Sequence, residues 1–333
     1  HRILAWALTL LVSLISLCFS YMLLNQVLIE DTITYAMGGW VAPWGIEYYI
    51  DKLTAYMLLI VNGITVLVLL GAREIVESDI ASDRIYLFYT AFLLNLTGLL
   101  GVITTGDAFN LFVFIEIASL SSYAMISLGR DKRSLYAAFK YLIFGTVGAS
   151  FILISVGLLY VVTGTLNIAD LSQQLTNTEN TPTITTAFVF FIIGIGIKAA
   201  IFPLHLWLPD AYTYSPSIVS TFLAGTTTKV FIYVLIRFIY SLYGYEFSFF
   251  TESFHYLLML SASGAILYGS YLAIKQDSLK RILAYSSIAQ IGYMVLGIAL
   301  ITELGLMASL VHILNHAFIK VGLFLAVTAI IYS

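Results

Sequence analysis

The sequence contains little of the chemistry on which most soluble enzymes depend. Cys18 is the single cysteine among 333 residues and lies in an apolar run, which excludes a disulfide framework and a cysteine metal site. Charged residues make up 10% of the chain, whereas soluble domains carry roughly 25%. The net charge of −3 comes without a basic patch, which argues against nucleic-acid binding. Because no nucleotide, flavin or iron–sulfur motif is present, we expect no cofactor, and any redox chemistry would belong to partners.

Apolar residues account for 60% of the chain and are grouped into long runs. A bilayer-spanning backbone must satisfy its own hydrogen bonds, so runs of this length predict helices rather than strands. The predicted fold class is an all-α polytopic membrane protein with about ten transmembrane helices, as a single domain over 1–333. The ten predicted segments lie at about 3–28, 52–72, 84–104, 108–128, 135–162, 184–206, 216–241, 255–274, 282–301 and 304–332.

Basic residues between these segments fall on alternating connections. One side carries Arg2, Arg73, Arg84, Arg130, Lys132, Arg133, Lys275, Lys280 and Arg281, and the other carries only Lys52. The positive-inside rule places the first side in the cytoplasm.

Four charged residues lie deep within predicted spans: Lys198, Lys229, Lys320 and Glu116. A charge at the bilayer centre costs from about 2.5 kcal/mol upward, and such residues typically mark ion or proton paths. The simplest arrangement pairs Glu116 with Lys198. At ~4 Å and an effective dielectric near 20, their attraction is about 4 kcal/mol, comparable with the burial cost. The pair could therefore change protonation state, or it could be a static bridge that only fixes helix packing.

Glycine and proline crowd the segment around Lys198, in GIGIKAAIFPLHLWLPDAYTYSP. Gly194, Gly196 and Pro203 predict an interruption near residues 200–203, because proline removes a helix hydrogen bond and broken helices at membrane depth line cavities or sites. An ordinary proline kink is the alternative.

Lys229 follows Thr226, Thr227 and Thr228, whose hydroxyls could bond the ammonium or hold water beside it. Roughly a dozen residues separate it from either helix end, too far for its side chain to reach the interface. We therefore expect a proton-relay role. Arg237, farther along the same span, stays charged and is expected to anchor at the interface.

The last predicted span carries His312, His316 and Lys320 at a spacing of four residues, on one helical face next to Asn315. Because imidazole accepts a proton on one nitrogen and donates from the other, this stripe predicts a proton wire. Zinc binding is not favoured, since no HExxH pattern or nearby carboxylate accompanies the histidines. A bis-histidine haem site is not favoured either, because His205 and His255 lie near span ends.

Two further residues are possible accessory groups. Lys140 is about one turn inside the cytoplasmic surface, so its side chain is expected to extend to that surface, with proton uptake as the alternative. His205 either accepts protons from Lys198 or Lys229 or lies at the interface.

Several long motifs resemble the antiporter-like membrane subunits of respiratory complex I, of Mrp sodium/proton antiporters and of membrane-bound hydrogenases. They are GDAFNLFVFIEIASLSSYA, KAAIFPLHLWLPDAYTYSPSIVS, TTTKVFIYVLIRF, KRILAYSSIAQIGYM and HILNHAFIKVGLF. GDAFNLFVFIE and LPDAYTYSPS look most like the D-type subunit of the Mrp antiporters. The resemblance implies that proton translocation uses Glu116, Lys198, Lys229, His312, His316 and Lys320.

The same resemblance implies an inverted-repeat architecture, with a first repeat at 84–241 and an incomplete second repeat at 255–333. The chain starts with His and ends within an apolar stretch, so we expect a fragment that lacks the family's first helix and its C-terminal helices. The expected function is proton translocation by a subunit of a multisubunit complex in a prokaryotic cell membrane, with other membrane subunits as partners and protons, and in some complexes sodium, as the ions. Such a subunit is not catalytic by itself.

A secondary transporter of a small solute is the alternative, since these also use broken helices and midplane charges. A scaffold subunit that only anchors a redox arm is a third possibility.

Overall fold

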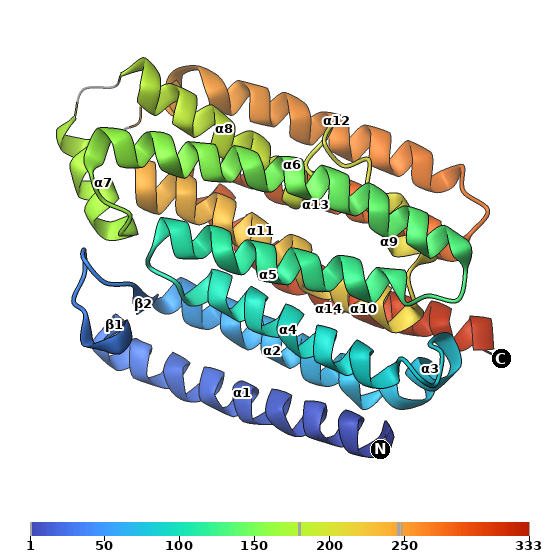
Figure 1. Ribbon diagram of the computed structural model, residues 1–333. Coiled ribbons are helices and arrows are strands. Elements are labelled where there is room, and N and C mark those ends of the chain that lie inside the picture. Colours follow the sequence, from blue (N-terminus) through green and yellow to red (C-terminus); the bar gives the residue numbers. More distant parts are fainter. Residues whose placement is uncertain (1, 179–180, 245–246, 248, 333) are drawn as a thin grey trace.

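A computed structural model describes residues 2–178, 181–244, 247 and 249–332. Long helices lie side by side and run between two opposite ends of the molecule (Figure 1). Within these residues, nine helices are long and apolar enough to cross a bilayer, and a tenth apolar helix, Pro182–Lys198, is shorter. The nine include Ser217–Tyr243 as one span, so the ten predicted segments are accounted for, although the sixth and the seventh are interrupted.

The helices, in chain order, are α1 (Arg2–Glu30), α2 (Lys52–Leu70), α3 (Ala72–Asp79), α4 (Ile85–Thr104), α5 (Ala108–Ser127), α6 (Lys132–Thr163), α7 (Ile168–Asn177), α8 (Pro182–Lys198), α9 (Leu208–Tyr214), α10 (Ser217–Gly225), α11 (Thr227–Ile236), α12 (His255–Ile274), α13 (Leu279–Ala299) and α14 (Glu303–Tyr332). Short helical turns of other types cover Met37–Gly39, Arg237–Tyr243 and Phe250–Phe254. Two strands, β1 (Ile33–Ala36) and β2 (Glu47–Ile50), pair antiparallel, with Ile33 opposite Ile50.

Polar residues at the ends of the apolar runs define where several helices begin. Asp51, Asp107 and Asp131 each accept a hydrogen bond from a backbone N–H in the first turn of α2, α5 and α6. Such caps satisfy donors that the helix leaves unpaired. Gly164 ends α6 in the left-handed conformation, with φ of 73°, that favours glycine.

The helices α10 and α11 form the centre of the bundle, because almost all of their residues are buried. Around them pack α2, α4, α8, α9, α13 and α14. α1 lies at the edge of the bundle against α2 and buries only Thr9, Ser13, Ser20 and Val27. Ser20 accepts a hydrogen bond of 2.7 Å from Asn62 of α2. Small and polar residues at this contact let the two backbones approach closely in the membrane.

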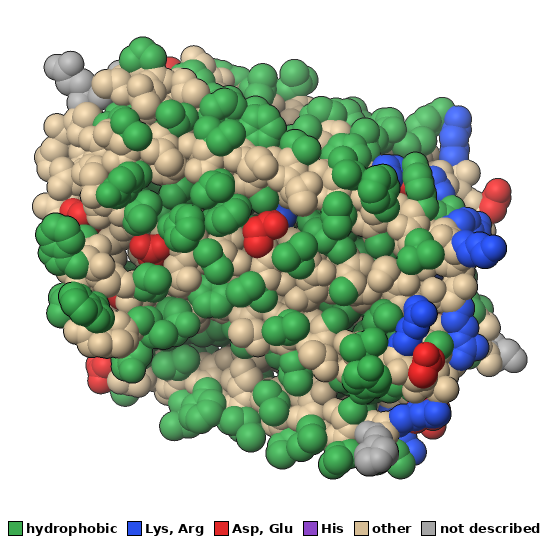
Figure 2. Space-filling model, in the orientation of Figure 1, with side chains coloured by type: hydrophobic (Ala, Val, Ile, Leu, Met, Phe, Trp, Pro, Cys, Tyr) green, Lys and Arg blue, Asp and Glu red, His purple; other side chains and the backbone are tan. Residues whose placement is uncertain are grey.

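The two ends of the molecule differ in charge. Lys and Arg side chains gather at the end where α1 begins and α14 ends (Figure 2), which agrees with the predicted cytoplasmic side. The strands and α7 lie at the opposite end (Figure 1). There Lys52 pairs with Asp31 at 2.7 Å, and the hydrogen bond from Lys52 lowers the pKa of the Asp31 carboxyl. On the face shown in Figure 2, the region between the two ends carries hydrophobic and other uncharged groups and few charges.

Candidate functional site

α8 ends at Lys198, so the predicted segment 184–206 is not one continuous helix. Regular helix resumes only at Leu208, and Ala200 between them has a φ of 57°. The predicted interruption near residues 200–203 beside Lys198 is therefore confirmed. Ile201 N–H donates to the carbonyl of Gly196 at 2.8 Å, and Trp207 Nε1 donates to the carbonyl of Ile197 at 2.7 Å. These bonds satisfy carbonyls that the end of α8 leaves unpaired.

The two glycines of α8 serve different purposes. A Cβ on Gly194 would lie 2.6 Å from the carbonyl oxygen of Gly148, so this glycine allows close contact between α8 and α6. Gly196 lies next to the interruption, and its carbonyl accepts the hydrogen bond from the N–H of Ile201. Pro203 is within the irregular segment itself. Only Gly196 and Pro203 thus belong to the break.

Lys198 and Glu116 form the expected ion pair. The ammonium of Lys198 lies 3.0 Å from Glu116 Oε1 and donates a second hydrogen bond, of 2.7 Å, to Ser119 Oγ on the same helix as Glu116. Lys198 is in the last turn of α8, where the helix dipole favours a positive charge. The Lys198 side chain is fully buried. Ser119 was not predicted from the sequence, although its place one turn after Glu116 could have suggested it.

Lys229 lies beside a second helix break, which was not predicted from the sequence. The predicted span 216–241 is interrupted at Thr226, which separates α10 from α11, and it changes to a wider helix from Arg237 onward. The ammonium of Lys229 donates to the carbonyl of Ala224 and, at 3.4 Å, to Thr228 Oγ1. The hydroxyl of Thr226 donates to the carbonyl of Phe222, one turn earlier. A threonine hydroxyl that bonds a backbone carbonyl in this way competes with the hydrogen bonds of the helix. The run of threonines was the available signal.

The stripe on α14 points into the bundle. His316 and Lys320 are buried, and Lys320 donates to the carbonyl of Leu283 at 2.7 Å and to Ser286 Oγ at 2.5 Å, both on α13. The rings of His312 and His316 stack with centroids 6.0 Å apart. In the described part of the chain, both ring nitrogens of His316 and Nε2 of His312 are buried without a partner. Asn315 is exposed and does not belong to this group.

The buried charges therefore form two groups. Glu116, Ser119 and Lys198 make the first. Lys229 interacts electrostatically with His312, His316 and Lys320 in the second. Among the residues that the structure describes, no hydrogen bond joins Lys198 to Lys229.

The two accessory residues have neighbours that the sequence did not predict. Lys140 does not extend freely to the surface, because its ammonium pairs with Asp210 of α9 at 2.7 Å. Asp210 lies 70 positions away in the chain, so the sequence around Lys140 could not predict this partner. His205 is 2% exposed and packs against the rings of Phe202 and Tyr268, so its side chain does not face the outside of the bundle.

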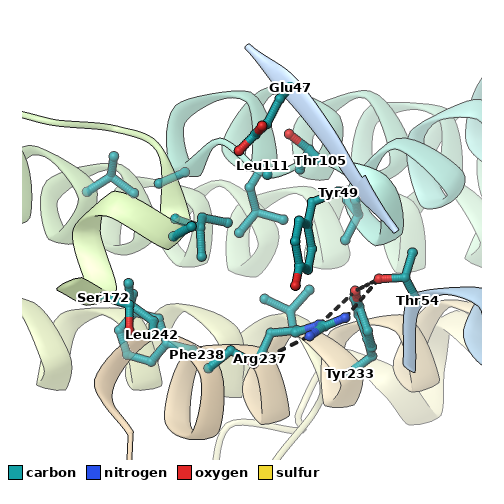
Figure 3. A pocket seen from close by; sticks show the side chains of 18 of the residues that line it. Glu47, Tyr49, Thr54, Thr105, Leu111, Ser172, Tyr233, Arg237, Phe238 and Leu242 are labelled. Carbon is teal, nitrogen blue, oxygen red and sulfur yellow. Dashed lines mark hydrogen bonds between the residues drawn. The ribbon is translucent and has the colours of Figure 1, made fainter. Parts of the chain in front are cut away.

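Arg237 is partly buried and has protein partners near the end of the bundle that carries the strands. Its guanidinium donates to Asp51 Oδ1. It also donates to Thr54 Oγ1 at 2.8 Å and to the hydroxyl of Tyr233 at 3.0 Å (Figure 3). This group forms part of the wall of a cavity of about 410 Å³ near the end that carries the strands, which Glu47 also lines. Asp51 was not predicted as a partner, because the two residues are 186 positions apart in the sequence.

Comparisons with known proteins match this architecture. Residues 105–333 match the family described as NADH:quinone oxidoreductase/Mrp antiporter, transmembrane. The chain belongs to this family. It is 45% identical over 297 residues to the N subunit of the NADH-quinone oxidoreductase of Desulforudis audaxviator. This alignment covers 87% of this chain and 57% of that protein. It is 32% identical over 289 residues to the D-type subunit of the Na(+)/H(+) antiporter of Alkalihalophilus pseudofirmus, with the same two coverages of 87% and 57%.

Solved structures of the family show the same fold. One chain in the Mrp complex from Dietzia sp. DQ12-45-1b aligns with a TM-score of 0.89 at 27% identity, over 99% of this chain and 60% of that one. A chain of the membrane-bound sulfane sulfur reductase, an archaeal respiratory membrane complex, aligns with a TM-score of 0.87 at 30% identity, over 97% of this chain and 65% of that one. The chain thus spans about 60% of the length of the family members it matches.

Proposed function

We propose that this chain carries protons as one subunit of a multisubunit ion-pumping complex in a prokaryotic cell membrane. The relatives are subunits of NADH-quinone oxidoreductases and of sodium/proton antiporters, and the structural neighbours are multisubunit membrane complexes. In both settings the partners are other membrane subunits. The transported ions are protons, with sodium as the exchanged ion in an antiporter.

One observation carries the proposal: within the described chain, the buried ammonium groups of Lys229 and Lys320 bond only carbonyls and hydroxyls and have no carboxylate partner. An unpaired buried ammonium is unstable relative to its neutral amine. Each of these lysines can therefore release a proton that it has accepted. Packing alone would be achieved at lower cost by apolar side chains.

The path follows from the two groups of charges. A proton from the cytoplasmic side charges Lys198, while Glu116 stabilises the charged form. It then passes through water to Lys229 and on to His316 and Lys320. Buried polar atoms without a protein partner in the described residues, such as Thr227 Oγ1 and the ring nitrogens of His316, support hydration between these groups. His312 extends this stripe by one turn.

The test is ion flux by the full-length protein in its assembled complex, reconstituted in vesicles. Lys198→Ala and Glu116→Ala are each expected to abolish proton or sodium/proton transport without preventing membrane insertion. Lys52→Ala is the matched control, because Lys52 forms an exposed ion pair at the end that carries the strands. Normal transport in both site variants would refute the proposal. Solute uptake in place of ion flux would instead support the secondary-transporter alternative.

A further inference from the structure

A second cavity, of about 500 Å³, lies at the end of the molecule that carries the basic residues. It lies where the first residues of α6, α10 and α13 meet the end of α9, and none of its lining residues belongs to the proposed proton path. Its charged lining residues are Arg130, Arg133, Lys280, Arg281, Asp79 and Asp131. Four cations and two carboxylates leave a net charge of +2 on this wall.

The nearby carboxylates are already engaged. Asp79 accepts from the backbone N–H of Ser217 at 2.6 Å and from the hydroxyl of Tyr332. Asp131 pairs with Arg133 at 2.7 Å, and the hydrogen bond from Arg133 lowers the pKa of the Asp131 carboxyl, so it stays ionised. Asp210, beside the cavity, is shared between Lys140 at 2.7 Å and Arg281 at 3.7 Å.

Donors for an additional anion remain on the wall. Arg281 Nε is buried and has no hydrogen-bond partner among the described residues. α13 begins beside it, and the side chain of Ser278 makes no capping bond to that helix. The first-turn N–H groups of a helix attract anions when no side chain caps them. Lys280 donates to the carbonyl of Ser215 and to Ser217 Oγ, which leaves one of its three N–H bonds for a ligand.

We propose that this cavity binds the phosphate group of an anionic membrane lipid. Basic pockets between transmembrane helices on the cytoplasmic side are suited to such headgroups. The position favours a lipid over a soluble phosphate compound, because the cavity lies at the ends of membrane spans. Leu135 and Tyr136 follow Arg133, Leu279 precedes Lys280, and all three are exposed apolar side chains that can contact an acyl chain.

Native mass spectrometry of the full-length protein in neutral detergent tests the site. The probes are short-chain phosphatidylglycerol, short-chain phosphatidylcholine and inorganic phosphate. We expect saturable binding of phosphatidylglycerol alone. Arg133→Gln and Arg281→Gln should each weaken it about fivefold, since one basic residue near a membrane surface contributes about 1 kcal/mol to binding an anionic lipid. Arg133 is exposed, so its variant is expected to fold even if Arg281→Gln does not.

Lys275→Gln is the matched control. Lys275 lies between α12 and α13, shortly before Lys280 and Arg281, and does not line the cavity. Equal binding of phosphatidylcholine, or equal weakening by the Lys275 variant, would overturn the proposal and reduce the basic residues to a general positive-inside signal. Displacement of the lipid by millimolar phosphate would also overturn it and assign the cavity to a soluble phosphate compound.

Discussion

Lys198 and Glu116 form an unequal pair, because the lysine side chain is fully buried whereas 23% of the glutamate side chain is exposed. Groups outside the described residues can therefore contact the carboxylate of Glu116, whereas the ammonium of Lys198 is enclosed by this chain. The other hydrogen-bond partner of the ammonium, the hydroxyl of Ser119, is uncharged. A change at Glu116 therefore alters the charge balance of the whole group.

The first prediction separates the charge of Glu116 from its hydrogen bond. Glu116→Gln keeps an acceptor at the same reach but removes the charge, so we expect proton transport to fall at least tenfold. Glu116→Asp keeps the charge with a shorter side chain and should retain more activity than the glutamine variant. Dye-reported proton flux in vesicles measures both, with the exposed Glu303→Gln as control. Full activity of Glu116→Gln would show that the carboxylate charge is dispensable.

The second prediction concerns the irregular segment after α8. Trp207→Phe removes the donor to the carbonyl of Ile197 while keeping an aromatic ring that can stack on Tyr141. The carbonyl of Ile197 keeps the N–H of Ala200 at 3.2 Å, so the variant loses one hydrogen bond, worth about 0.5–1.5 kcal/mol, and the melting temperature should fall modestly. Trp44→Phe is the control, because Trp44 is 91% exposed and should melt as the unaltered protein does. Equal melting of both variants would mean that this hydrogen bond does not hold the segment.

The third prediction tests the contact between α6 and α8. Gly194→Ala places a methyl group 2.6 Å from the carbonyl oxygen of Gly148, so the two helices must separate, at a cost of about 1–3 kcal/mol. Gly157→Ala is the matched control in α6, where a Cβ meets no described atom within 4 Å. Thermal unfolding in detergent should show a loss for residue 194 and no loss for residue 157. The reverse order would contradict the packing described above.

The fourth prediction distinguishes a proton site from a packing residue. Lys320→Met removes the ammonium but preserves much of the side-chain volume, and replacement of a buried charge by an apolar group is often neutral or stabilising. The carbonyl of Leu283 keeps the hydroxyl of Ser287 as a donor. We expect unchanged or higher thermal stability together with loss of proton transport. A stable variant that still transports protons would exclude Lys320 from the path.

The length of the apolar runs was enough to predict the spans, because a bilayer imposes the same length on every helix that crosses it. The break after Lys198 was predictable for a different reason, since proline and glycine act locally on the backbone. The break at Thr226 has no proline, and its threonines are compatible with either a continuous or an interrupted helix. The inverted repeat over 84–241 and 255–333 stays a prediction.

Partners distant in the chain were not predictable. Arg237 and Asp51 are 186 positions apart, and Lys140 and Asp210 are 70 apart. Both basic residues were assigned to the interface because only their distance from a span end was visible in the sequence. The pairing of Glu116 with Lys198 succeeded because Glu116 was the one deep carboxylate available to a deep lysine.

The break at Thr226 has a mechanical consequence. At the end of α10 the ammonium of Lys229 bonds the carbonyl of Ala224, and so takes the place of an amide that an unbroken helix would provide. When the lysine gives up its proton it has one fewer N–H to offer, and the carbonyl loses a strong donor. In the proposed path, loss of a proton from Lys229 would therefore weaken the hydrogen bond at the end of α10, so that the charge of this lysine and the shape of the broken helix would be coupled.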